Sequence, residues 1–130
     1  MLFRSNDYNA DRYAGVLKLV KEKSNWSSAA NNVHRGVAAY FCHNTYVAEV
    51  IDLVFKDNKP IIEKVTAAVD CGVVVNPDAA ANMGEGAIVD GIGNALYGEM
   101  TFKDGVPQKN NFNTYRMPTL PTRCYFATHH

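Results

Sequence analysis

The sequence has few cysteines, no excess of charge of either sign and no long hydrophobic run. Its three cysteines, Cys42, Cys71 and Cys124, form no Cys-x-x-Cys pair and lie near no histidine array, so they predict neither a disulfide framework nor a zinc site. Thirteen basic residues balance thirteen acidic ones, which argues against a nucleic-acid partner. No segment approaches the roughly 18 apolar residues of a membrane-spanning helix, so we expect no direct membrane insertion. These absences predict a soluble protein, cytoplasmic or periplasmic, without a metal site of its own.

The composition is that of a folded domain. The sequence predicts that this domain begins with an amphipathic helix. Of the 130 residues, 47 % are hydrophobic and 20 % are charged, proportions that are ordinary for a single globular domain. Asn9 is placed to cap the helix, because its side chain can accept hydrogen bonds from first-turn amides that have no partner. Apolar residues then recur three and four positions apart, as on one helix face, at Tyr13, Val16, Leu17 and Val20.

Segments rich in β-branched and aromatic residues then predict three strands. The segments Gly36–Cys42 and Thr45–Lys56 are separated only by His43-Asn44, which predicts a hairpin. Both faces of the second segment are largely apolar, so we expect this strand to be covered on both sides. A third strand is expected from Ile61 to Asp70. Together these segments predict a small, mostly antiparallel sheet.

The centre of the chain is a glycine-rich segment that begins with Asn76-Pro77. Asn76 can cap a helix, and Pro77 suits its first position, where a missing amide hydrogen costs nothing. Each glycine in a helix weakens it by roughly 0.5–1 kcal/mol relative to alanine. The apolar period nevertheless continues through Gly84, Gly86, Gly91 and Gly93. The segment is therefore either one helix, whose glycines allow a sheet, another backbone or a ligand to approach closely, or a turn between two shorter helices.

The C-terminal third is expected to add a hairpin and little other regular structure. Asp104-Gly105 is a two-residue loop that suits a type I′ turn, and Pro107 confines the second arm to an edge. Residues 119–130 are expected to be irregular. The fold class predicted for the whole chain is α/β, in a two-layer α+β arrangement. In it, a small, mostly antiparallel sheet packs against the N-terminal helix and the glycine-rich central helix.

Few residues suggest a site when the sequence is taken by itself. The glycine-rich segment lacks a dinucleotide-binding fingerprint, because the third glycine would fall at Val89 or Leu96. Glu85 lies between two glycines and is either a ligand contact or a solvated helix residue. Glu49 is an acidic residue among apolar strand neighbours. An edge position of the strand or a basic partner would explain its presence there. Cys71 is either a reactive thiolate or a small buried apolar group. The absence of a basic residue near it in sequence favours the second interpretation.

Several ordered motifs resemble one known family. The run Asp70–Pro77 reads DCGVVVNP, and Asn82–Glu99 reads NMGEGAIVDGIGNALYGE. Shorter matches follow the same order, at Arg35–Ala38, Val47–Val50, Phe102–Gly105 and Asn111–Arg116. Together they resemble the molybdopterin-binding subunit of the xanthine dehydrogenase/aldehyde oxidase family, in the branch of isoquinoline 1-oxidoreductase beta subunits and membrane-bound aldehyde dehydrogenases. Residues 1–118 are interpreted as a fragment of the molybdenum-cofactor-binding domain, and 119–130 as a tail outside the family.

The resemblance implies an oxidoreductase that hydroxylates an aldehyde or N-heterocycle carbon, with water supplying the oxygen and molybdopterin as the cofactor. The family's Gln-x-Glu-Gly segment borders the pterin and maps here onto residues 83–86, with Met83 in place of the glutamine. A thioether cannot donate the hydrogen bond of an amide. The residues expected to bind the cofactor, as one wall of its site, are Asn76, Met83, Gly84, Glu85 and Gly86.

The resemblance also implies that parts of the active site lie elsewhere. The family's catalytic glutamate lies beyond the segment matched by Arg116-Met117-Pro118, so no catalytic residue is expected in this chain. We therefore expect the isolated fragment to be inactive and to hold no cofactor. The expected partners are the rest of the molybdenum subunit, an iron–sulfur subunit and further copies of this chain. The alternative is a non-catalytic, truncated remnant that only associates with itself or binds a partner.

Overall fold

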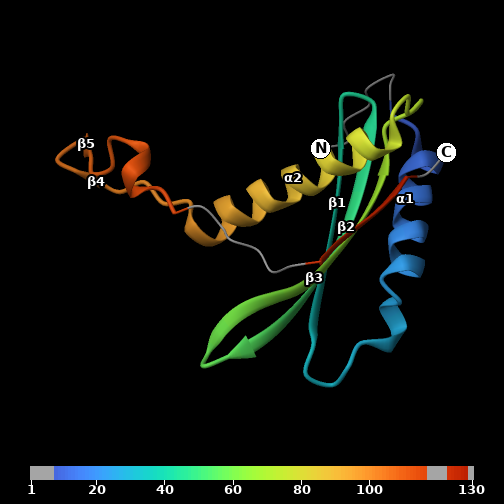
Figure 1. Ribbon diagram of the computed structural model, residues 1–130, viewed down its shortest axis with the longest axis horizontal. Coiled ribbons are helices and arrows are strands. Elements are labelled where there is room, and N and C mark those ends of the chain that lie inside the picture. Colours follow the sequence, from blue (N-terminus) through green and yellow to red (C-terminus); the bar gives the residue numbers. More distant parts are fainter. Residues whose placement is uncertain (1–7, 117–122, 129–130) are drawn as a thin grey trace.

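The structure, a computed structural model, describes residues 8–116 and 123–128 and shows a sheet with a helix on each face (Figure 1). The mixed class and the mostly antiparallel sheet predicted from the sequence are confirmed. None of the helices in the described ranges is both long and apolar enough to cross a bilayer. The elements, in chain order, are α1 (Ala10–Lys23), a 3-10 helix (Trp26–Ser28), β1 (His34–Cys42), β2 (Thr45–Lys56), β3 (Lys59–Asp70), α2 (Pro77–Tyr97), β4 (Phe102–Lys103), β5 (Val106–Pro107), a second 3-10 helix (Phe112–Thr114) and β6 (Arg123–Thr128).

The sheet has the strand order β1-β2-β3-β6, and its first three strands form an antiparallel meander. Both turns of the meander contain two residues with positive φ. These are His43 (47°) and Asn44 (58°) before β2, and Asp57 (51°) and Asn58 (61°) before β3. Such two-residue turns match the right-handed twist of the strands they join. The hairpin predicted at His43-Asn44 is therefore confirmed, and β2 lies between two hydrogen-bonded partners.

Strand β6 completes the sheet by pairing in parallel with β3. The sequence prediction differs from the structure here, because six residues of the segment expected to be irregular form this strand. Pro118 and Pro121 favoured an irregular end, but both precede the strand and so remove no amide from it. The pairing supplies partners for the N–H and C=O groups along the outer edge of β3. Such long-range pairing leaves no local pattern in the sequence.

Helix α1 covers one face of the sheet and begins as predicted. Oδ1 of Asn9 accepts hydrogen bonds from the amides of Asp11 at 3.0 Å and Arg12 at 3.1 Å. Leu17 lies at the margin of the apolar stripe and remains exposed. Tyr13 is partly buried and packs against a cluster of fully buried side chains that joins the stripe to the sheet and comprises Val16, Val20, Tyr46, Ala48, Val50 and Ala68.

Helix α2 covers the opposite face. It runs without interruption over Pro77–Tyr97, so the single-helix alternative is confirmed. Asn76 caps it as predicted, because its Oδ1 accepts a hydrogen bond from the amide of Ala79 at 3.1 Å. With a helix on either side of β2, the body has three layers instead of the two predicted. A second cluster joins α2 to β3 and comprises Val65, Ala67, Ile88 and Ile92.

Residues 98–116 form an arm that extends from the end of α2 away from the sheet (Figure 1). The arm contains the predicted hairpin, in which Asp104 (φ 51°) and Gly105 (φ 77°) join β4 to β5. At Gly98, where the arm begins, a Cβ would clash with the backbone carbonyl of Asn94. The arm exposes large apolar side chains, namely Met100, Phe102, Val106 and Phe112.

Candidate functional site

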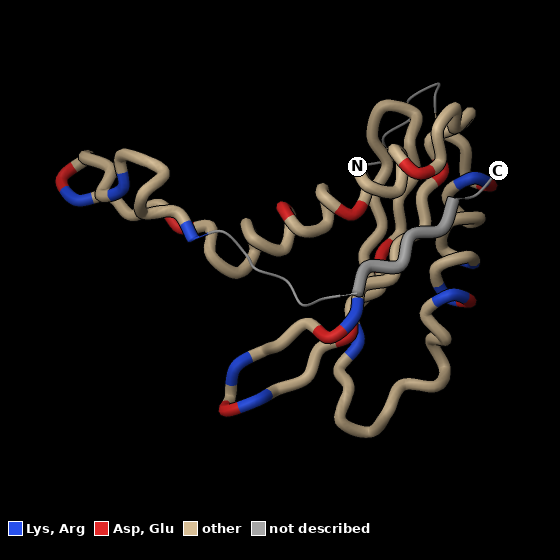
Figure 2. Tube along the Cα trace, in the orientation of Figure 1, with Lys and Arg blue, Asp and Glu red and all other residues tan. Residues whose placement is uncertain are grey.

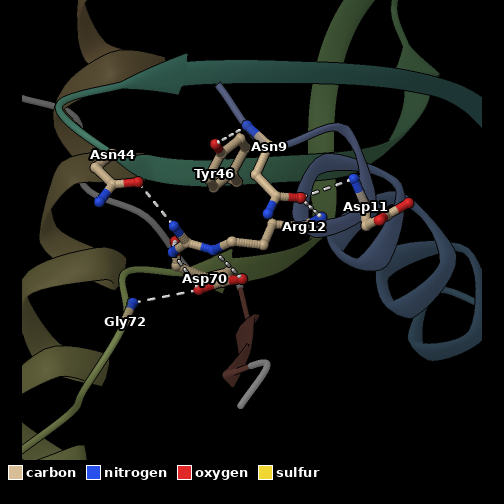
Figure 3. Close-up of polar contacts among 7 residues, drawn as sticks. All are labelled: Asn9, Asp11, Arg12, Asn44, Tyr46, Asp70 and Gly72. Carbon is tan, nitrogen blue, oxygen red and sulfur yellow. Dashed lines mark hydrogen bonds and ion pairs between the residues drawn. The ribbon is translucent and has the colours of Figure 1, made fainter. Parts of the chain in front are cut away.

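An ion pair between α1 and the end of β3 anchors the first part of the site (Figure 3). The guanidinium of Arg12 donates to both carboxylate oxygens of Asp70, from Nε at 2.9 Å and from Nη2 at 2.6 Å. It also donates to Asn44 at 2.8 Å and lies 4.6 Å from the centroid of the Tyr46 ring. The hydrogen bonds to Asp70 raise the pKa of Arg12. Helix α1, the β1–β2 turn and β3 are therefore held together at this end of the sheet.

The same carboxylate orients the loop that leads from β3 to α2. Asp70 accepts a further hydrogen bond from the amide of Gly72 at 3.2 Å, and Gly72 has a φ of 79°, which favours glycine. Beyond it, Val73 is 94 % exposed and Val75 is 93 % exposed. An open cavity of about 780 Å³ lies between this loop and Arg12. Apolar side chains held in solvent beside a cavity are typical of a surface that another molecule covers.

The five residues predicted to bind the cofactor lie along the cap and first half of α2, and the structure brings only some of them together. Met83 and Gly84 line a cavity of about 360 Å³ between α2 and the sheet. Glu85 and Gly86 do not line this cavity, and Asn76 lies at the helix cap. Met83 is 77 % exposed, whereas Glu85 is half-buried. The five residues thus form a strip along the helix and not a closed pocket.

Two glycines of α2 leave open space beside the helix. A Cβ added at Gly86 or at Gly91 would meet no atom of the described chain within 4 Å. The sequence suggested that these glycines allow a sheet to approach the helix closely. At Gly86 and Gly91, no strand of the described chain comes that close. Each glycine still weakens the helix by about 0.5–1 kcal/mol relative to alanine.

Glu49 is the acidic residue that the structure places beneath α2. It pairs with Ala38 on β1 and with Ala67 on β3, so its strand is central and the edge position offered by the sequence is wrong. Its side chain lines the cavity of about 360 Å³ and also a second cavity of about 410 Å³. Burial raises the pKa of its carboxyl above the ordinary value. No cation lines either cavity within the described residues, so the expected basic partner is not found there.

Two exposed thiols lie at the same end of the sheet as Arg12. Cys71 is exposed, so its prediction as a small buried group is wrong, because the chain turns toward solvent directly after β3. Cys42 is also exposed, and its Sγ lies 2.9 Å from Nδ1 of His43. Over residues 8–116, no group of three His, Cys, Asp or Glu side chains is arranged to hold a metal ion.

Sequence reasoning missed the pairing of Arg12 with Asp70. The two residues are 58 positions apart, and nothing local links a helix arginine to the last residue of a distant strand. One feature of the sequence pointed to it. Asp70 ends a largely apolar strand, and a carboxylate buried there needs a partner.

The two helices differ in charge (Figure 2). Helix α1 carries residues of both signs, with Asp11 in its first turn and Lys21 and Lys23 in its last. Helix α2 contains no lysine or arginine, and its charged residues are Asp78, Glu85 and Asp90. With Glu49 beneath it, the charged residues of α2 and of the cavities under it are all acidic within the described residues, although the whole chain has no net charge.

Comparisons with known proteins agree with the resemblance in the sequence. The family described as molybdopterin cofactor-binding domain matches residues 9–122. The isoquinoline 1-oxidoreductase subunit beta of Brevundimonas diminuta is 32 % identical over 112 residues, which cover 82 % of this chain. The membrane-bound aldehyde dehydrogenase (pyrroloquinoline-quinone) of Gluconacetobacter polyoxogenes is 30 % identical over 112 residues, which cover 80 % of it. The matched region amounts to 14 % of the length of each relative.

A solved structure has a similar fold. The quinoline 2-oxidoreductase from Pseudomonas putida 86 matches with a TM-score of 0.55 and 20 % sequence identity, over 65 % of this chain and 11 % of that chain. At this identity the likeness concerns the fold alone. Much of the architecture described above therefore recurs within a far longer polypeptide.

Proposed function

The chain belongs to the molybdopterin cofactor-binding domains of the molybdenum hydroxylase family, and from that premise we propose that it forms one wall of the molybdopterin site in a larger oxidoreductase subunit. The assembled subunit would hydroxylate an aldehyde or an N-heterocycle. The observation that carries the proposal is the open space beside Gly86, where the chain keeps a glycine that its own packing does not require.

The residues along α2 fit a flat ring with polar edges. Gly86 lets such a ring reach the helix backbone, and the half-buried Glu85 offers a carboxylate that accepts N–H donors. Met83 offers a polarizable apolar contact in place of an amide. Gly84 lines the same cavity as Met83, and Asn76 fixes where the helix starts. When bound, the molybdopterin would supply the redox chemistry, and this strip of residues would hold and orient its ring.

Turnover would require the remainder of the molybdenum subunit. The chain matches 14 % of the length of its relatives, and no catalytic glutamate of the family maps onto it. The exposed valines of the β3–α2 loop and the apolar side chains of the arm are surfaces that the remainder would cover. An iron–sulfur subunit would then accept the electrons. The isolated chain would be inactive.

Metal and pterin analysis of purified protein tests this function. The chain is purified alone and in complex with a relative's molybdenum subunit from which the matched segment has been removed, in a host that makes the cofactor. Molybdenum and the fluorescent oxidation product of the pterin are expected in the complex and not in the isolated chain. Gly86→Ala should lower both contents in the complex, whereas Gly91→Ala, a matched open glycine outside the Gln-x-Glu-Gly match, should not. Full cofactor content in the Gly86 variant would contradict the proposal.

A second candidate function is a non-catalytic module that binds itself or a partner chain. The exposed apolar side chains of the arm, Phe102 and Phe112 among them, favour it. Light scattering after size-exclusion chromatography distinguishes the two functions when combined with the metal analysis. A stable dimer that takes up neither molybdenum nor pterin in the presence of the remaining subunit would establish the module and exclude the cofactor wall.

A further inference from the structure

Glu49 and the cavities beside it are the part of the structure that the proposed function does not use. The carboxylate lies on the sheet face that α2 covers, between cavities of about 360 Å³ and about 410 Å³. Among the described residues, Glu49 alone lines both cavities. It therefore marks the point where two apolar spaces meet.

The walls around this carboxylate are small and apolar. Its cross-strand neighbours, Ala38 and Ala67, carry only a methyl group each, so they leave the carboxylate accessible from either cavity. Across the cavities, α2 presents Ala87 on one side and Ala95 on the other. No lysine, arginine or histidine of the described chain lines either space. The walls thus offer apolar contact and one acceptor of high charge density.

A carboxylate in such surroundings is costly unless a donor reaches it. The carboxylate of Glu49 makes no hydrogen bond or ion pair within the described residues, and burial raises its pKa because the ionised form loses hydration. An entering cation would restore that lost interaction. A long basic side chain would in addition bury its methylene stem in one of the cavities, as lysine and arginine stems commonly do.

The field around the cavities favours a cation as well. Helix α2 lines one side of both cavities. It carries Asp78, Glu85 and Asp90 and no basic residue (Figure 2). The helix and the cavities beneath it thus contribute carboxylates and no basic group among the described residues. Acidic residues near a cavity raise the local concentration of cations and lower that of anions.

We propose that the space between β2 and α2 is a socket for a basic side chain, arginine or lysine, whose charged end pairs with Glu49. The side chain comes from the polypeptide that covers this face, and in that respect the inference rests on the proposed function. The relatives suggest which polypeptide this is. Only 14 % of their length matches this chain, so the remaining 86 % is available to cover this face. The pairing joins the sheet beneath α2 to the rest of the subunit.

Titration of the isotope-labelled chain with matched peptides tests the socket. The probes are an acetylated, amidated pentapeptide Gly-Leu-Arg-Leu-Gly, the same peptide with citrulline as the neutral isostere of arginine, and the small cation n-butylguanidinium. The readouts are the carboxyl ¹³C resonance of Glu49 and the amide resonances of Ala38 and Ala67. A charge-assisted hydrogen bond predicts that the arginine peptide binds about tenfold or more tightly than the citrulline peptide.

The variants distinguish pairing with Glu49 from general attraction to an acidic surface. Glu49→Gln should abolish the preference for arginine over citrulline, whereas Glu63→Gln, an exposed glutamate on β3, should leave it unchanged. If Glu49→Gln alters the dispersion of the amide spectrum, Glu49→Asp takes its place and should weaken arginine binding by withdrawing the carboxylate. Equal affinity for arginine and citrulline, or an unchanged preference in the Glu49 variants, overturns the socket. n-Butylguanidinium carries only the side-chain group, so it should bind more weakly than the arginine peptide and lose its binding in Glu49→Gln; binding that survives Glu49→Gln would also overturn the socket. None of these readouts depends on molybdenum or pterin, so the socket and the cofactor wall can fail separately.

Discussion

The two faces of the central sheet are completed to different degrees. On the α1 face, Arg12 pairs with Asp70 and Arg35 with Asp52, and the core beneath them is fully buried. On the α2 face, Glu49 has no such partner in the described chain and opens onto two cavities. One face therefore satisfies its charges within these residues, and the other leaves both charge and space for a second molecule.

The two faces differ in what their residues contribute: those of the α1 face stabilise the fold, and those of the α2 face serve the proposed contact. Side chains of the α1 face should carry most of the free energy of unfolding, because they lose both packing and charge pairing when substituted. Residues of the α2 face should tolerate substitution or even gain stability, because their conformations serve a contact that lies outside the described chain. Four substitution experiments test this comparison, and they are given in decreasing order of the expected change in stability.

The two tyrosines on opposite faces of the sheet give the largest contrast. Tyr46 is fully buried, stacks on Phe41 with 4.8 Å between ring centroids, and its hydroxyl accepts from the amide of Asn9 at 2.6 Å. Tyr46→Ala should cost about 4 kcal/mol of unfolding free energy, as for other large aromatic truncations. Tyr40 is 70 % exposed, and Tyr40→Ala should stay within about 0.5 kcal/mol of the parent. Urea unfolding measures both, and equal losses would refute the difference between the faces.

The ion pair of Arg35 and Asp52 should give the next largest effect. Both side chains are nearly buried, at 10 % and 12 % exposure, and the guanidinium donates to Oδ1 at 2.6 Å and to Oδ2 at 2.9 Å. Arg35→Met leaves the carboxylate without its partner and should cost about 2 kcal/mol, below the range for fully buried pairs. Adding Asp52→Leu should recover part of the loss. As a control, Lys109→Met removes a looser ion pair in the arm, and its thermal midpoint should barely move.

Gly86→Ala should act in the opposite direction and stabilise the isolated chain. The added Cβ meets no atom within 4 Å, so the gain in helix propensity of about 0.5–1 kcal/mol is not offset by a clash. Gly98→Ala is the informative counterpart, because its Cβ would meet the carbonyl of Asn94 and lower the midpoint of unfolding. Both midpoints are read from thermal unfolding followed by circular dichroism. A loss of stability in the Gly86 variant would mean that packing within the chain requires this glycine.

Glu49→Gln should give the smallest effect, and one that depends on pH. Burial raises the pKa of Glu49 in the folded chain, so ionisation opposes folding as the pH rises above the unfolded value of about 4.3. The Gln variant lacks this penalty and should be more stable at pH 7 by less than about 1 kcal/mol, with no difference near pH 3. Cys71 is the only other titratable group on the cavity walls among the described residues. Glu63→Gln controls for the general loss of a negative charge, and a difference that persists in acid would argue against this assignment.

Local patterns predicted most of the elements. The cap at Asn9, the hairpin at His43-Asn44 and the helix start at Asn76-Pro77 all follow from short-range hydrogen bonding and backbone preferences. The parallel strand β6 and the third layer escaped prediction because they depend on which edge and which face remain free after the other strands have paired. The strip of candidate residues on α2 was named from the family resemblance, and in the structure Met83 and Gly84 line the cavity of about 360 Å³ whereas Asn76, Glu85 and Gly86 do not.

The first helix, the two predicted hairpins, the helix start at Asn76-Pro77 and the family could be inferred from the sequence, because they depend on neighbours within a few positions and on ordered motifs. Only the tertiary structure decided that Arg12 meets Asp70 across 58 positions and that Glu49 lies beneath α2 with two cavities beside it. The physical reason is that a charge is satisfied or left open by what folding brings within a few ångströms of it. The sequence names the charged residues, and the packing of the two helices on the sheet decides which of them are paired.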